Sequence, residues 1–120
     1  MITRVITLVA RAALLTGCGR DPDLSTLSTQ PLRIATFRGG REVAVRNVSP
    51  PSREHELLAA WAAQHKTGWS ISCVSYAPGT LLVHGTNFSL NIHASGVILN
   101  IGGRQYKHDA PASDFSFLSQ

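Results

Sequence analysis

Apolar and polar residues alternate along residues 80–107, and three short turn-forming pairs interrupt the alternation. The pairs are Thr86-Asn87, Ser95-Gly96 and Gly102-Gly103, and each suits the centre of a two-residue hairpin loop. Because successive side chains of a strand point to opposite faces, each loop also fixes which residues face one another. The stretch therefore predicts a meander of four antiparallel strands.

The predicted register gathers the apolar side chains of the meander on one face. Across the second loop it places Leu90 opposite Ile101 and Ile92 opposite Leu99, and across the third it places Leu99 opposite Tyr106. We expect this face to form the core. Its members are Leu81, Val83, Phe88, Leu90, Ile92, Val97, Leu99, Ile101 and Tyr106.

Two further segments have the pattern of strands. Residues 33–46 predict a hairpin around Gly39-Gly40, which either covers the second face of the sheet or extends its edge. Its loop pairs Thr36 with Val43, Ile34 with Val45, Ala35 with Ala44 and Phe37 with Glu42. Residues 69–76 predict a fifth strand of the meander. A Pro78-Gly79 turn would pair Tyr76 with Leu81 and Val74 with Val83.

One long helix is predicted between residues 49 and 66. Ser49 or Ser52 can cap its first turn, and Gly68 is a natural stop. The face formed by Leu57, Leu58, Trp61 and His65 is expected to cover the apolar side of the sheet. A short helical turn from Ser113 would pack Phe115 and Leu118 against the same core. The fold class is thus α+β, with one helix packed on an antiparallel meander sheet of about five strands and an additional N-terminal β-hairpin. Residues 33–120 would form this single small domain.

The N-terminal segment carries a short processing motif. Residues 1–17 contain Arg4 and an apolar-rich stretch and lead into Leu15-Thr16-Gly17-Cys18. This tetrapeptide resembles a bacterial lipobox. The resemblance implies that residues 1–17 are a signal peptide, that Cys18 receives diacylglyceryl and N-acyl chains such as palmitate, and that the membrane is a partner through this anchor. Since Gly19 rather than aspartate follows, the motif resembles those sorted to the outer membrane, on the side that faces the periplasm.

Other features of the N-terminal region bear on the same prediction. Arg11 interrupts the apolar stretch, so an amphipathic helix on a cytosolic protein is the alternative. Residues 18–32 are rich in Ser, Thr, Asp and Pro and predict a flexible tether after the lipidated cysteine. If Cys18 is acylated, Cys73 has no intrachain partner and is expected to be a small buried thiol. If it is not, a Cys18–Cys73 disulfide is possible in an oxidising compartment.

Charge and known motifs narrow the classes of function. The formal charge is +4, and without Arg4 and Arg11 nine basic residues stand against seven acidic ones, so we expect no nucleic-acid partner. The sequence has no GxSxG, P-loop, GxGxxG or HExxH motif. We therefore expect no enzyme, no catalytic residue, no cofactor and no metal site. A small hydrolase that uses a histidine of the sheet region, His84, His93 or His108, is the alternative.

The second face of the meander is the candidate binding surface. Uncharged amides with two apolar contacts suit the recognition of a protein or a glycan, although this face can also be the hydrated side of an antiparallel sheet. The candidate residues are Ser75, Leu82, His84, Asn91, His93, Ile98, Asn100 and Gln105. The expected function is that of a small, envelope-tethered, non-enzymatic binding protein with a protein partner, such as an inhibitor or immunity-type lipoprotein against a toxin or hydrolase. A structural envelope component is the remaining alternative.

Overall fold

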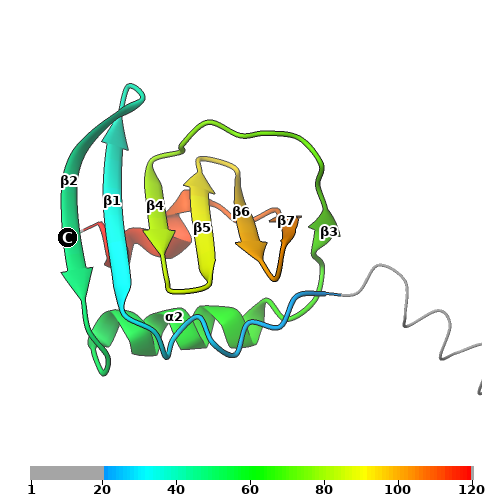
Figure 1. Ribbon diagram of the computed structural model, residues 1–120, viewed down its shortest axis with the longest axis horizontal. Helices are drawn as coiled ribbons and strands as arrows, with labels where there is room; N and C mark the ends of the chain where they lie inside the picture. The colour runs from blue at the N-terminus through cyan, green and yellow to red at the C-terminus, as the bar shows by residue number, and fades with distance from the viewer. Residues whose placement is uncertain (1–20, 120) are drawn as a thin grey trace, which may run out of the picture.

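A computed structural model describes residues 21–119 of the chain, and in it an antiparallel sheet packs against two helices (Figure 1). The α+β class is therefore as predicted. The sheet has seven strands: β1 (Leu32–Arg38), β2 (Arg41–Val48), β3 (Ser70–Ile71), β4 (Leu81–His84), β5 (Phe88–His93), β6 (Gly96–Ile101) and β7 (Arg104–His108). The helices are the α-helix α2 (Arg53–Gln64) and the 3-10 helix η1 (Ala112–Leu118).

The strands lie in the order β2-β1-β4-β5-β6-β7-β3, so the sheet is wider than the five strands predicted. The N-terminal hairpin extends the edge of the meander, because β1 pairs with β4. This pairing also explains why the predicted fifth strand is wrong. With β4 already paired to β1 and β5, no strand from residues 69–76 can pair with it. That segment supplies only the two-residue β3, which pairs with β7 at the opposite edge.

The meander register is confirmed at two of its three loops. Val83 faces Leu90 across the first loop, and Leu99 faces Tyr106 across the third. The second register is wrong by two residues, because Leu90 faces Leu99 and Phe88 faces Ile101.

The error in the second register comes from the position of the loop. The loop residues are Ala94 and Ser95, because His93 pairs with Gly96. Gly96 does not have a positive φ, and it is the first residue of β6. A Cβ added to it would stand 3.2 Å from the carbonyl oxygen of His108. This glycine therefore permits the close approach of β7 rather than a turn.

The β1–β2 hairpin follows the predicted register only beside its loop, where Phe37 faces Glu42. Beyond that pair the register shifts, and Val43 is the unpaired residue of a β-bulge. As a result Ile34 faces Arg46 and Ala35 faces Val45, so the other predicted pairs of this hairpin are wrong.

The core lies on one side of the sheet. Ser52 caps α2 by accepting a hydrogen bond from the His55 amide at 3.1 Å, as predicted. The helix crosses the ends of the central strands, while η1 lies behind them in the view of Figure 1. The two helices contribute Leu58, Trp61, Ala62, Phe115 and Leu118 to the same buried cluster as the apolar sheet face. The predicted core face is confirmed, although Ile101 is only partly buried.

The described part of the predicted tether, residues 21–32, packs on the domain instead of being flexible. Leu24 and Leu27 are buried in the core cluster, and Leu32 belongs to β1. Asp21 also accepts a hydrogen bond from the Trp69 amide at 3.0 Å. Two leucines three positions apart thus attach to the core a segment whose polar residues are mostly exposed or half-buried. Among the described residues, none of the helices has the length and hydropathy needed to span a membrane.

Candidate functional site

The face of the sheet opposite the core, called here the outer face, carries two rows of side chains across the meander. One row is His84, Ser89, Asn100 and Gln105, on β4 to β7. The other is Leu82, Asn91, Ile98 and Lys107 on the same strands. Seven of the eight candidate residues therefore lie on this face, as the strand alternation predicts. The predicted register of the second loop would have placed Asn100 opposite Asn91, whereas Asn100 lies opposite Ser89 and thus in the other row.

The long connection between β3 and β4, residues 72–80, lies against the outer face. The side-chain amide of Asn91 donates to the carbonyl oxygen of Ala77 at 3.0 Å and accepts from the Gly79 amide at 2.7 Å. Asn91 is 7% exposed and Ile98 is 2% exposed. Asn91 therefore holds the connection, and both candidate side chains are largely buried and offer little surface to a ligand.

Gln105 fastens the beginning of the same connection. Its side-chain amide donates to the carbonyl oxygens of Val74 at 2.5 Å and Ser72 at 3.5 Å. Its main-chain carbonyl accepts from the Ser72 amide at 2.9 Å. Gln105 keeps partial exposure, so it both supports the connection and contributes to the surface beside it.

The two histidines of the outer face are not brought together. His84 pairs with Ser89 at one end of β5, while His93 lies at the other end of that strand. The His93 ring lies 6.0 Å from the ring of Tyr76, and its Nε2 is buried without a hydrogen-bond partner among residues 21–119. No group of three potential metal ligands exists in the described part of the chain.

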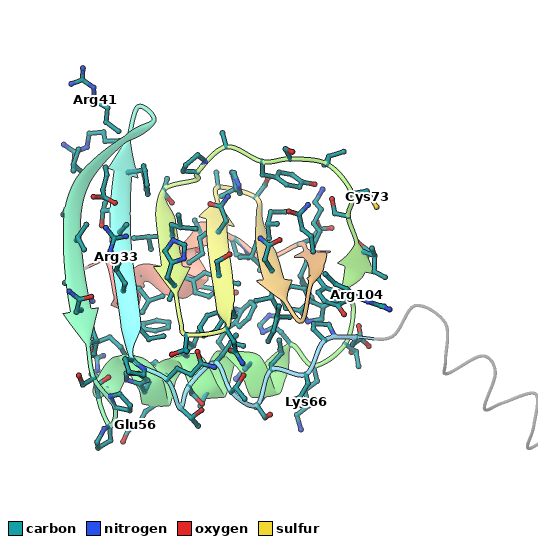
Figure 2. All side chains as sticks on the ribbon, in the orientation of Figure 1. Arg33, Arg41, Glu56, Lys66, Cys73 and Arg104 are labelled. Carbon is teal, nitrogen blue, oxygen red and sulfur yellow. The ribbon has the colours of Figure 1, made fainter. Side chains whose placement is uncertain are left out.

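Ser75 and Cys73 lie on the connection rather than in a strand. Both are exposed, so the expectation that Cys73 is a buried thiol is wrong. Figure 2 shows Cys73 on the connection next to β3, with its sulfur directed outward. The segment leaves the sheet after Ile71, and its side chains from Cys73 to Ser75 are therefore not packed between layers.

Two shallow hollows meet on the outer face beside the β6–β7 turn, and together they form what we call the outer groove. The first, about 570 Å³, lies over the ends of β4 to β7, and the second, about 630 Å³, lies between β7 and the beginning of the connection. Both contain Gly103, Arg104 and Gln105. The other polar residues that line the two hollows are His84, Asn87, Ser89, Asn100, Ser72, Cys73 and Ser75.

The outer groove contains residues outside the predicted candidate set. Asn87 and Arg104 flank the β4–β5 and β6–β7 turns, which end at the same side of the sheet. Gly102 and Gly103 have φ angles of 61° and 75°, so the third predicted loop leaves bare backbone inside the groove. The sequence does contain a signal for these residues. In a meander every second turn lies at the same end of the sheet, so the first and third predicted loops had to lie on one side.

The charge of the outer groove is set by Arg104, the sole charged side chain among its described lining residues. Amide, hydroxyl and imidazole groups surround this guanidinium. Such a surface can donate several hydrogen bonds and can pair with a carboxylate or phosphate oxygen. It suits a polar ligand that is neutral or negatively charged.

Comparison with known proteins identifies no relative. No protein-family model matches the chain, and neither a curated protein nor a solved structure matches it. The lipobox Leu15-Thr16-Gly17-Cys18 lies outside residues 21–119, as does the rest of the predicted signal peptide. The outer groove and the N-terminal sequence motif are the features that bear on function.

Proposed function

We propose that the protein is a small non-enzymatic binding protein, attached to the bacterial envelope through a lipid on Cys18, that holds a protein partner in the outer groove. The observation that carries the proposal is the row of His84, Ser89, Asn100 and Gln105, which presents one polar group from each of four hydrogen-bonded strands. Because the sheet already holds these side chains in place, little conformational entropy is lost when a partner binds.

The chemistry of the groove favours binding over catalysis. In the described chain, Nε2 of His93 has no hydrogen-bond partner, and the ring nitrogens of His108 bond to the main-chain oxygens of Asp109 and Thr67. Neither histidine is therefore paired with a carboxylate that would orient it as a general base. Arg104 instead supplies a charge-assisted donor next to the amides. An acidic or amide side chain of the partner fits this set, as an inhibitor or immunity-type protein would require against a toxin or hydrolase.

The N-terminal sequence supports the proposed attachment to a membrane. Cys18 precedes Asp21 by three residues, which span at most about 11 Å. Asp21 is itself hydrogen-bonded to the Trp69 amide. A lipid on Cys18 would therefore hold the folded domain close to a membrane, where it meets envelope partners at high local concentration.

The test for the address uses Cys18→Ser. We expect the mature protein to be in the membrane fraction, with a mass that corresponds to cleavage after Gly17 and acylation of Cys18. The Cys18→Ser variant should leave this fraction. Protein in the cytosolic fraction that still carries residues 1–17 would contradict attachment to the membrane. This result would not bear on the binding site proposed in the outer groove.

The test for the groove uses a photo-crosslinking amino acid at Asn100 and, as a control, at Lys66, which follows the C-terminal end of α2 and does not line the groove. In envelope extracts we expect Asn100 to give one specific crosslinked partner that Lys66 does not. Arg104→Glu should reduce this crosslink at least tenfold, while Arg53→Glu should leave it unchanged. Equal crosslinking from Asn100 and Lys66 would contradict a site in the outer groove.

A further inference from the structure

The outer edge of the sheet, along β2, is a second surface with open hydrogen-bonding groups. β2 has eight residues and pairs with β1 on one side, and Figure 1 shows no element beyond its other side. Val43 and Val45 in its middle are 52% and 41% exposed. The opposite edge differs, because β3 has only two residues. An exposed strand of this length is a template for the addition of another strand.

The direction of the main-chain groups of β2 follows from its neighbours. Phe37 donates its amide to Thr80 on the β4 side, and neighbouring residues of a strand alternate in direction. Thr36 and Ile34 therefore point toward β2, where they face Ala44 and Arg46. The intervening residues of β2, Val45 and Asn47, direct their amide and carbonyl groups to the open edge.

A hollow lies beside these open groups. It has a volume of about 390 Å³ and runs under the β1–β2 hairpin. Its lining combines apolar side chains with one arginine at each end: Ile34, Thr36, Arg38, Val43, Ala44, Val45, Arg46 and Ser119. A strand that adds to β2 would place alternate side chains next to this hollow.

The charge of the hairpin determines the kind of strand that fits. Residues 33–46 contain four arginines and one glutamate. Arg33 pairs with Glu42 at 3.3 Å and Arg46 pairs with Glu54 at 2.6 Å, so Arg38 and Arg41 are the two without an ion pair among the described residues. Figure 2 shows Arg41 at the tip of the hairpin, pointing away from the rest of the sheet. A second copy would bring two such positive edges together, whereas an acidic segment would be attracted.

We propose that β2 is a docking edge for an extended acidic segment of a partner protein, which adds an eighth strand to the sheet. The site is separate from the outer groove and does not depend on the function proposed for it. Main-chain hydrogen bonds to Val45 and Asn47 would supply affinity, and Arg38 and Arg41 would select acidic sequences.

The test uses the full chain carrying Cys18→Ser and an eight-residue peptide in which valine alternates with glutamate. Amide hydrogen exchange is measured by NMR at a peptide concentration that saturates the chemical shifts. We expect exchange to slow at Val45 and Asn47, whose amides face the open edge. Ala44 and Arg46 are internal controls, because their amides already face β1.

Variants and altered peptides separate main-chain pairing from charge. Val45→Pro removes an amide that faces solvent and should weaken binding at least about tenfold, which is the loss of one or two hydrogen bonds. A peptide with N-methyl groups on alternate amides should lose affinity for the unmodified chain to the same extent. Arg41→Glu should weaken binding several-fold, while Arg104→Glu in the outer groove should not.

Three results would overturn the docking edge. The first is unchanged exchange at Val45 and Asn47 when the acidic peptide is present. The second is equal binding of a peptide in which lysine replaces glutamate. The third is slower exchange at these amides as protein concentration rises without peptide, which would assign the edge to a second copy of the chain.

Discussion

The two faces of the sheet are stabilised in different ways. On the inner face, side chains from the strands, both helices and residues 21–31 form one apolar cluster. On the outer face, residues 72–80 are held through two amide side chains, Asn91 and Gln105. Apolar packing uses many small contacts, whereas the outer attachment rests on a few directional bonds. The outer face can therefore leave polar groups open for a ligand without exposing the core.

The largest effect is expected on the inner face. Leu90 is fully buried at the centre of β5, and Leu90→Ala should lower the free energy of unfolding by about 2–5 kcal/mol through lost burial and the remaining cavity. Urea denaturation followed by circular dichroism measures this change. Ser89→Ala, the neighbouring residue on the outer face, should alter stability by no more than about 0.5 kcal/mol. Similar losses in both variants would contradict the assignment of the two faces.

The attachment of the outer connection gives the next largest effect. Asn91→Ala leaves the Gly79 amide and the Ala77 carbonyl without their partners, which should cost about 1–3 kcal/mol. It should also accelerate proteolysis within residues 72–80, because this segment is no longer fastened there.

Asn100→Ala is the matched control for Asn91→Ala. Asn100 is exposed on the same face, and its side chain makes one bond of 3.4 Å to Ser89. We expect no measurable change in either stability or proteolysis. If the two asparagine variants behave alike, the outer connection is not held by Asn91.

The inner face could be predicted from the sequence because it depends on the period of two alone. A loop at Ala94-Ser95 or at Ser95-Gly96 leaves every side chain on the same face, since the two registers differ by an even number of residues. The core face was thus insensitive to the error at the second loop. The rows of the outer face were sensitive to it, because a row depends on which residues stand opposite one another.

The path of residues 72–80 could not be predicted from local signals. Pro78-Gly79 is a good turn sequence, but β1 occupies the edge of β4 that a local hairpin would need. That pairing joins segments about 50 residues apart, and no local pattern shows it. Asn91 was found as an outer-face residue, yet its role in binding the connection depends on the same long-range arrangement.

The β6–β7 turn tests whether the backbone shapes the outer groove. Gly102 has a φ angle of 61°, and a Cβ there would contact nothing within 4 Å. Gly102→Ala should therefore cost about 1 kcal/mol through backbone conformation rather than through a clash. Gly102→Asn should cost less, because asparagine tolerates the left-handed region. Thermal unfolding would show the order glycine, asparagine, alanine, and an equally stable alanine variant would contradict the turn geometry.

The smallest effect is expected at the edge strand β2, where an ion pair rather than apolar packing joins the inner face of the sheet to the helices. Arg46 donates to Glu54 at 2.6 Å and to the Leu118 carbonyl at 3.1 Å, so it joins β2 to both helices. The hydrogen bond from Arg46 lowers the pKa of the Glu54 carboxyl. A carboxyl whose pKa is lower in the folded protein adds stability above its ordinary pKa of about 4.3, and this stability is lost as the pH falls through the lowered value.

Glu54→Gln should therefore reduce the unfolding free energy at pH 7 by less than about 1 kcal/mol. The difference from the unmodified protein should shrink as the pH falls from about 4.3 through the lowered pKa of Glu54, below which the carboxyl is protonated in both states. Urea denaturation at a series of pH values measures this, and Glu56→Gln, two residues further along the first turn of α2 and exposed, is the control. A difference that stays constant down to pH 2 would show that the effect of Glu54 is packing rather than charge, and the edge of the inner face would then resemble its centre.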